Sequence, residues 1–146
     1  MPELHILIFT VIGLALVFDF INGFHDTANA IATSVSTRAI SPRDAILMAA
    51  ILNFLGAMYS TGVAKTIGAD IVRSAGHVNE HVLIAALSGA VIWNILTWWA
   101  ALPSSSSHAL VGGVIGAVLV STGLEGLNLW GIGKIILSLV ASPVLA

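Results

Sequence analysis

The chain has 146 residues, of which 58% are hydrophobic and only 8% are charged. Soluble domains are roughly half hydrophobic and about a quarter charged, because charged side chains must cover their surface. The composition therefore nearly excludes a soluble globule and favours a chain that lies in a lipid bilayer. A formal net charge of −2 without a basic cluster argues against nucleic acid as a partner. The sequence contains no cysteine, which excludes disulfides, thiolate metal sites and cysteine nucleophiles.

Apolar stretches of membrane-spanning length follow one another along the chain. About 20 predominantly apolar residues are needed to cross the hydrocarbon core of a bilayer. Four stretches reach that length: Leu4–Gly23, Ala45–Ala64, Val82–Leu102 and Leu127–Ala146. The apolar stretch Ala109–Thr122 is shorter, which favours a re-entrant or half-spanning helix. The sequence therefore predicts an all-α polytopic membrane protein in which residues 1–146 form a single transmembrane unit.

The orientation in the membrane depends on few charges. No Lys or Arg precedes the first apolar stretch and no small-residue cleavage site follows it, so we interpret it as a mature helix and not as a signal peptide. Arg38 and Arg43 lie in the link after this helix, whereas only Glu3 and His5 precede its apolar residues. The positive-inside rule then predicts that the N-terminus lies outside and that the link lies in the cytoplasm.

Polar side chains interrupt the end of the first apolar stretch. They recur at spacings of three, four and three residues: Asp19, Asn22, Asp26 and Asn29. These spacings place all four on one stripe of a helix. Gly23 permits the backbone to unwind and to bind ions, with Ala28–Val35 continuing as a second half-helix. The alternative is that the helix ends at Gly23 and that an interfacial loop follows.

A second polar segment follows the third apolar stretch. It reads Pro103-Ser104-Ser105-Ser106-Ser107-His108 and leads directly into the short, glycine-rich apolar stretch. Proline ends the preceding helix, and serine is a favoured N-cap for the next one. Hydroxyl groups, free backbone amides and the positive end of a helix dipole converge there, so the segment predicts an anion site without formal positive charge. The alternative is a hydrophilic surface turn that only caps a helix.

Two histidines adjoin these polar segments. His108 is a candidate to carry a proton or to position the serines, and His25, beside Asp26, is a weaker candidate for a proton relay. Ser, His and Asp together do not indicate a hydrolase here, because the serines lack a Gly-x-Ser-x-Gly elbow and Ser107 directly precedes His108. The sequence also has no metal-spaced His/Glu motif. We therefore expect no enzymatic activity.

Small and amide-bearing residues within the apolar stretches indicate helix contacts. Gly112 and Gly116 form a GxxxG pair with Gly113 adjacent, which permits helices to approach closely. Asn53 and Asn94 interrupt otherwise apolar stretches. We expect these two asparagines to form interhelical hydrogen bonds and not to contact a substrate.

The two polar segments resemble motifs of the inorganic phosphate transporters of the PiT type, and most closely the bacterial low-affinity phosphate permeases. Residues 23–30, Gly-Phe-His-Asp-Thr-Ala-Asn-Ala, are similar to the family signature Gly-Ala-Asn-Asp-Val-Ala-Asn-Ala. Residues 103–108 are similar to its Pro-x-Ser-Thr-Thr-His loop. His25 stands where the broader family has Asn, and it matches the bacterial permease branch. Two motifs at the right separation make the resemblance specific.

The resemblance implies a symporter of inorganic phosphate that consists of two inverted halves with discontinuous helices. Each half brings one copy of both motifs to a central site, the second on a re-entrant, serine-rich hairpin. Carried over residue by residue, Ser105, Ser106 and Ser107 would bind phosphate oxygens. This chain has one copy of each motif, so we expect it to be the N-terminal inverted repeat of a longer transporter. The second half would then belong to the same chain. The alternative is a self-contained half that pairs with an inverted copy of itself or with a separate partner.

The resemblance also implies a coupling cation. Asp26 and Asn29 would hold it, or a divalent metal that travels with phosphate, with Asn22 and Asp19 in support. A doubly negative phosphate in a dry site needs compensating positive charge, and neither motif contains Lys or Arg. Cation and anion must therefore enter together. The sequence leaves open whether the cation is a proton or sodium, whether a neutral metal–phosphate complex is carried, and which metal that would be. No cofactor beyond the co-transported ions is implied.

Two other functions remain open at this point. Hydroxyl groups and amides bind any tetrahedral oxyanion, so a permease for sulfate is the first alternative. In a non-transporting membrane scaffold, the second alternative, the polar stripe would only hold helices together. The resemblance favours phosphate transport in contact with the lipids of a bacterial cytoplasmic membrane.

Overall fold

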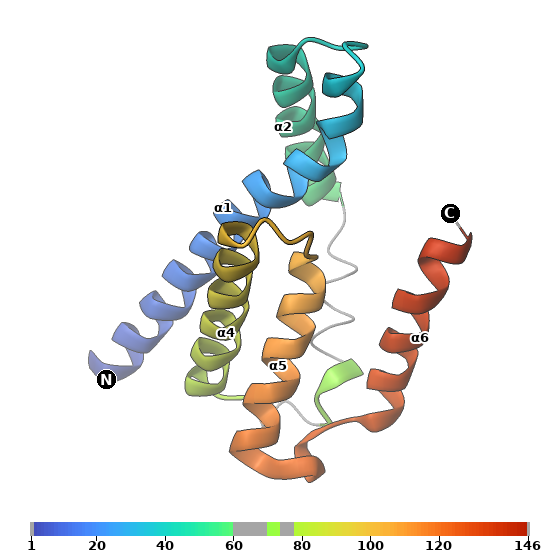
Figure 1. The fold of residues 1–146 in the computed structure, drawn as a ribbon. Helices are drawn as coiled ribbons and strands as arrows, with labels where there is room; N and C mark the ends of the chain where they lie inside the picture. The colour runs from blue at the N-terminus through green and yellow to red at the C-terminus, as the bar shows by residue number, and fades with distance from the viewer. Residues whose placement is uncertain (1, 60–69, 74–77, 146) are drawn as a thin grey trace.

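The computed structural model describes residues 2–59, 70–73 and 78–145. Its helices, in chain order, are α1 (Pro2–Ser36), α2 (Pro42–Tyr59), α4 (Glu80–Trp99), α5 (Ser106–Thr122), the 3-10 helix η2 (Gly123–Gly126) and α6 (Leu129–Leu145) (Figure 1). The extended pairing among the described residues is an isolated antiparallel bridge between Val72 and Leu127. The predicted all-α class is confirmed.

Three helical segments are long and apolar enough to cross a membrane: Glu3–Ser36, Glu80–Trp99 and Ser106–Gly126. Large apolar side chains cover the outer surface, and Phe20, Trp99 and Val120 are 74%, 81% and 89% exposed. Soluble monomers rarely expose contiguous apolar surface on this scale. The predicted membrane protein is therefore confirmed. Of the expected span Ala45–Ala64, α2 covers the part up to Tyr59, and residues 60–64 lie outside the described residues.

Helix α1 is one unbroken helix of 35 residues, so the predicted interruption or end at Gly23 is wrong. Asn22 donates a hydrogen bond to Asp26 one turn later, so part of the polar stripe satisfies itself without unwinding the backbone. An unbroken helix also keeps its backbone hydrogen bonds internal, as a bilayer requires. At 1.5 Å per residue α1 is roughly 50 Å long. Figure 1 shows it running obliquely past α4, with its C-terminal part beside α2.

Two helices end without a glycine. Ala101 follows α4 with a φ of 54°, and Arg38 follows α1 with a φ of 58°. Both lie in the left-handed region that favours glycine. After α4, the backbone amide of Ala101 donates to Trp98 and that of Leu102 donates to Thr97, at 3.0 and 2.9 Å. This hydrogen-bond pattern is a Schellman motif, which turns the chain sharply into the serine segment.

Helices α4 and α5 form an antiparallel hairpin joined by residues 100–105 (Figure 1). They approach most closely at Gly113, where an added Cβ would collide with the backbone carbonyl of Ala86. By contrast, an added Cβ at Gly112 or Gly116 would meet nothing within 4 Å. The predicted close helix contact is therefore made by Gly113 and not by the GxxxG pair beside it.

Helix α5 is longer than the stretch Ala109–Thr122 that the sequence indicated. Because Ser105 caps the helix, α5 begins at Ser106, and η2 extends it to Gly126. The resulting segment of 21 residues is long enough to cross a membrane by length and composition. The argument that this segment is too short to span is therefore wrong. Its re-entrant placement stays a prediction.

A small apolar core forms where α1, α4 and α5 meet. Its buried residues are Phe18, Ile21, Ala90, Val91 and Ala109. We call this group the three-helix cluster. A second core joins α4, α5, Leu127 and residues 71–72 at the other end of the hairpin, and Ile132 and Ile135 of α6 pack against it. The three-helix cluster holds α1 against the hairpin at the end where the serine segment lies, and it thereby positions both polar segments.

Candidate functional site

The polar stripe of α1 has its best-defined interactions at Asn22 and Asp26. Nδ2 of Asn22 donates to Oδ2 of Asp26 at 3.0 Å. The other carboxylate oxygen of Asp26 lies 3.6 Å from Nδ1 of His25. The Asp26 side chain is 39% exposed and lines a cavity of about 360 Å³ between α1 and α2. Asn22 therefore orients a carboxylate that remains accessible to a cation.

Helix α2 closes the other side of this cavity. Asn53 lines it and donates a hydrogen bond to Oγ1 of Thr27 at 3.4 Å. The predicted interhelical role of Asn53 is thus confirmed. We call this cavity the α1–α2 pocket.

The remaining members of the stripe lie elsewhere. Asp19 and Asn29 are both exposed. Asn29 lines a second cavity, of about 270 Å³, together with His25, Trp98 and Pro103. We call this cavity the α1–α4 pocket. The structure therefore brings Asn22 and Asp26 together, whereas Asp26 and Asn29 line different pockets on α1.

The serine segment forms the cap and first turn of α5. Oγ of Ser105 accepts a hydrogen bond from the backbone amide of His108 at 3.5 Å, as expected of an N-cap. Ser106 is fully buried, whereas Ser107 is exposed. Successive residues of an α-helix point about 100° apart, so the three serines do not share one face. An ion that contacts all three must lie at the N-terminal end of the helix, where backbone amides are also free.

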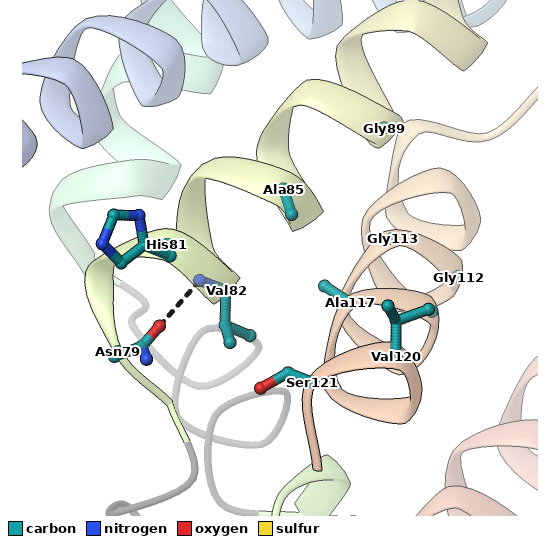
Figure 2. A pocket seen from close by; sticks show the side chains of 11 residues that line it. Asn79, His81, Val82, Ala85, Gly89, Gly112, Gly113, Ala117, Val120 and Ser121 are labelled. Atoms are coloured by element: carbon teal, nitrogen blue, oxygen red, sulfur yellow. Dashed lines mark hydrogen bonds between the residues drawn. The ribbon is translucent and has the colours of Figure 1, made fainter. Parts of the chain in front are cut away.

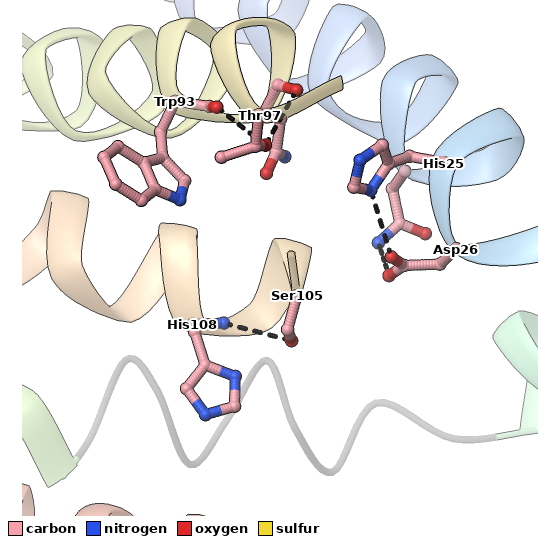
Figure 3. Close-up of polar contacts among 8 residues, drawn as sticks. His25, Asp26, Trp93, Thr97, Ser105 and His108 are labelled. Atoms are coloured by element: carbon pink, nitrogen blue, oxygen red, sulfur yellow. Dashed lines mark hydrogen bonds and ion pairs between the residues drawn. The ribbon is translucent and has the colours of Figure 1, made fainter. Parts of the chain in front are cut away.

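The two histidines lie in different surroundings. His108 is exposed, and Figure 3 shows its ring on the side of α5 away from Thr97 and His25. His25 is 7% exposed, and in Figure 3 it points from α1 toward the space next to α4 and α5. The structure therefore brings His25, and not His108, to the junction of the three helices.

Three buried polar side chains at this junction have atoms without hydrogen-bond partners among the described residues. They are His25 through Nδ1, Asn94 through both amide atoms and Ser106 through Oγ. Each comes from a different helix, α1, α4 or α5. A buried polar group without a partner costs about 1–3 kcal/mol. Such groups are candidates for ligand contacts, because binding would supply the partners.

Among the described residues, Asn94 does not form the interhelical hydrogen bond that the sequence predicted for it. It is fully buried, yet it makes no interhelical hydrogen bond to another described residue, so that prediction is wrong. One signal in the sequence marks its position. Ala86, Ala90, Asn94 and Thr97 recur at helical spacing, which places the amide on the packed face of α4.

The electrostatics of the two pockets are simple. Among the described residues that line them, Asp26 is the formally charged side chain, and Lys and Arg are absent. The part of the chain that the structure describes holds no group of three His, Asp or Glu residues that could bind a metal. A cation here would therefore be held by one carboxylate together with amide, hydroxyl and backbone oxygens.

A third cavity, of about 510 Å³, has a different character. It lies between α4 and α5 and is lined by Gly89, Gly112, Gly116 and other small residues (Figure 2). Its polar residues are Asn79, His81 and Ser121, and the rest of its lining is apolar. Oδ1 of Asn79 is already engaged, because it accepts from the backbone amide of Val82 at 3.0 Å. This cavity lacks converging polar groups and is not a candidate for the ion site.

An apolar helical assembly with polar pockets at the junction of its helices is the architecture of an integral membrane protein. Comparison with known families makes the assignment specific. The model of the phosphate transporter family matches residues 22–146. The chain belongs to this family, as its two motifs predicted.

Relatives with curated descriptions agree. The chain is 54% identical over 147 residues to a probable low-affinity inorganic phosphate transporter of Bacillus subtilis (strain 168), which covers 100% of this chain and 44% of that protein. It is 36% identical over 151 residues to the low-affinity inorganic phosphate transporter PitB of Escherichia coli (strain K12), which covers 95% of this chain and 30% of that protein. The chain thus spans less than half of either relative. Both are transporters and not enzymes.

A solved structure confirms the similarity in three dimensions. It is described as the sodium-dependent phosphate transporter and shares 38% sequence identity with this chain, at a TM-score of 0.87. The match covers 97% of this chain and 36% of that protein. The fold described above is therefore shared with a protein that transports phosphate.

Proposed function

We propose that this chain is the N-terminal inverted repeat of a cation-coupled symporter of inorganic phosphate. One observation carries the proposal. The α1–α4 pocket is lined by residues of both family motifs, His25 and Asn29 from the first and Pro103 from the second. Segments that are far apart in sequence thus line one cavity, with His25 and Asn29 as its polar residues, next to the loop that leads into α5. The second half of the site would come from the remainder of a longer transporter, as the length of the relatives supports.

The serines of the second motif are the proposed phosphate ligands. Ser105, Ser106 and Ser107 surround the N-terminal end of α5, where the positive end of the helix dipole and the free amides favour an anion. Ser106 contributes a hydroxyl group that has no other partner among the described residues. A phosphate oxygen would satisfy it.

The carboxylate of the first motif is the proposed cation ligand. Asp26, which Asn22 orients, would supply carboxylate oxygens to the cation in the α1–α2 pocket. Asn29 lines the α1–α4 pocket, so it would share the cation with Asp26 only if α1 and its neighbours rearrange. Asp19 would add negative charge about two turns before Asp26 on the same helix. The described lining of the pockets contains no Lys or Arg, so a bound phosphate needs a cation as its counter-charge. That requirement would couple the two ions. The solved relative is described as sodium-dependent, which favours sodium over a proton or a divalent metal.

The proposed setting is a bacterial cytoplasmic membrane with the N-terminus outside. Arg38 lies in the turn between α1 and α2, and Arg43 lies in the first turn of α2, so the positive-inside rule favours a cytoplasmic location for this turn. Lipid would cover the exposed apolar faces of the helices.

The decisive test of this function is Asp26→Asn in the protein expressed from its native gene, in cells that lack other phosphate uptake systems. Uptake of labelled phosphate should be abolished, because the amide cannot supply the negative charge that holds the cation. Asp44→Asn is the matched control, since Asp44 lies outside both pockets and accepts a hydrogen bond from Ser41 at 2.7 Å. The amount of protein in the membrane should be the same for both variants. Unchanged uptake by Asp26→Asn would contradict the assignment of Asp26.

The two alternatives make different predictions in the same cells. If sulfate is the substrate, an excess of unlabelled sulfate will suppress the uptake of labelled phosphate. If the protein is a membrane scaffold, its expression will add no phosphate uptake to these cells. We expect phosphate uptake that excess sulfate leaves unchanged.

A further inference from the structure

Three buried polar side chains that carry atoms without a described hydrogen-bond partner occupy equivalent places on three helices. His25, Asn94 and Ser106 each lie one helical turn from a member of the three-helix cluster. These neighbours in the cluster are Ile21, Ala90 and Ala109, in the same order. On each helix, the polar residue lies on the side of its cluster neighbour that is nearer to the loop between α4 and α5. The side chains therefore form a polar layer stacked on the apolar cluster.

Ring contacts support this placement of α1. The ring of Phe24 packs edge-on against that of Trp98, with centroids 5.6 Å apart. The part of α1 that carries His25 thus lies beside the last turn of α4, close to Asn94. Figure 3 shows His25 and Thr97 directed toward the start of α5.

The chemistry of the layer favours an anion. Asn94 offers two N–H donors at Nδ2, and Ser106 offers one hydroxyl donor. Ser106 also begins α5, so its surroundings include the free amides and the positive dipole end of that helix. Thr97, in contrast, already donates to backbone oxygens of its own helix, at 2.9 and 3.1 Å. Asn94 and Ser106 therefore hold donors of the layer that have no described partner, whereas Nδ1 of His25, also without a hydrogen bond, lies 3.6 Å from the carboxylate of Asp26.

We propose that Asn94 is a further substrate-binding residue, whose amide donates to an oxygen of the phosphate that Ser106 binds. This inference rests on the proposed function. It adds a phosphate-binding residue on α4, outside both family motifs. The site then draws on three helices, and the anion supplies the hydrogen-bond partners that the layer lacks in the described structure.

The α1–α4 pocket gives the layer a route to the aqueous phase. His25 belongs to both the layer and the pocket. The unpaired atoms of Asn94 and Ser106 are shielded from solvent in the described structure. Phosphate therefore reaches them when the start of α5 moves away from the end of α4 and opens the layer into the pocket.

The test separates a ligand from a structural residue, because the two roles predict opposite effects on stability. Asn94→Leu replaces an unpartnered buried amide by an apolar group of similar shape. Such a change keeps or raises the stability of the fold. We expect an unchanged or higher Tm in detergent together with a rise of about tenfold in KM for phosphate, equivalent to about 1.4 kcal/mol.

Asn94→Asp is the second variant, and it keeps the size of the side chain. It removes both donors and places a carboxylate beside the anion, so KM for phosphate should rise at least as much. Thr97→Val is the matched control on the same face of α4, because the hydroxyl of Thr97 is already satisfied within its helix. We expect Thr97→Val to keep both KM and Tm.

Several outcomes would overturn the inference. A lower Tm with unchanged KM in Asn94→Leu would show that the amide serves only the packing of the helices. A lower KM for the coupling cation in Asn94→Asp, with unchanged KM for phosphate, would make Asn94 a cation ligand. Absence of phosphate uptake by the wild-type protein would instead overturn the proposed function, and the inference with it.

Discussion

The contact between α4 and α5 at Gly113 gives a prediction that can be worked out from the structure. A methyl group at this position would collide with the backbone carbonyl of Ala86. Because a backbone carbonyl cannot rotate away as a side chain can, the two helices must separate. Gly112 lies one residue earlier on the same helix, and a methyl group there meets nothing within 4 Å. The two glycines therefore form a matched pair for substitution by alanine.

The expected magnitude follows from two effects. Alanine in place of glycine within a helix stabilises it by about 0.5–1 kcal/mol, and both variants share this gain. Overpacking at Gly113→Ala costs about 1–3 kcal/mol in addition. The free energy of unfolding of Gly113→Ala should therefore be about 1–3 kcal/mol below that of Gly112→Ala.

Thermal unfolding in detergent measures this difference, with the fluorescence of the four tryptophans as the signal. At about 2–4 °C per kcal/mol, the Tm of Gly113→Ala should lie several degrees below that of Gly112→Ala. Gly113→Ala should also transport less phosphate, since wider spacing of the hairpin displaces Asn94 and Ser106. Equal Tm values for the two variants would refute the close contact between α4 and α5.

Three further predictions concern named contacts. Asn22→Leu frees the carboxylate of Asp26 from its 3.0 Å hydrogen bond, so KM for the coupling cation should rise while KM for phosphate at saturating cation stays the same. Asn79→Ala removes the N-cap of α4 and should lower the free energy of unfolding by about 1 kcal/mol, as measured by thermal unfolding. A double-mutant cycle with Phe24→Ala and Trp98→Ala should give a coupling energy of about 0.5–1.5 kcal/mol, and additive effects would argue against their ring contact.

Much of the fold could be predicted from the sequence, because membrane-spanning helices depend on a simple property. Long apolar stretches with few charges cannot satisfy their backbone in lipid except as helices. The stretches around Leu4, Ala45, Val82 and Leu127 therefore marked the helices α1, α2, α4 and α6 correctly. Of these four, α1 and α4 are long and apolar enough in the described structure to cross a membrane, whereas the apolar part of α6 is shorter. The serine segment likewise predicted an N-cap, which the hydrogen bond of Ser105 confirms.

The errors arose where local signals compete with interactions along the helix. Gly23 suggested a break, yet the hydrogen bond from Asn22 to Asp26 satisfies the polar stripe within an intact helix. The GxxxG pair suggested which face of α5 contacts α4, yet the backbone of α4 at Ala86 comes closest to the neighbouring Gly113. Spacing along one helix shows which residues share a face, but not which neighbour that face meets.

Asn94 illustrates the same limit for the site. Its position on the packed face of α4 could be read from the spacing of Ala86, Ala90 and Thr97. That no described residue satisfies its amide is a property of the packing of three helices and has no local signal. The motifs indicated Asp26 and the serines because their chemistry is contained in short segments. A ligand that stands alone in an apolar helix becomes visible only in three dimensions.

The most direct test of the account is the uptake of labelled phosphate into proteoliposomes that contain the purified protein, with cation gradients imposed one at a time. We predict rapid accumulation of phosphate under an inward sodium gradient and its collapse when the gradient is dissipated. Accumulation under a proton gradient alone would show that phosphate uptake is coupled to a cation, but that this cation is the proton and not sodium. Phosphate uptake that is indifferent to every cation gradient would contradict the central claim that the anion enters with a cation bound near Asp26.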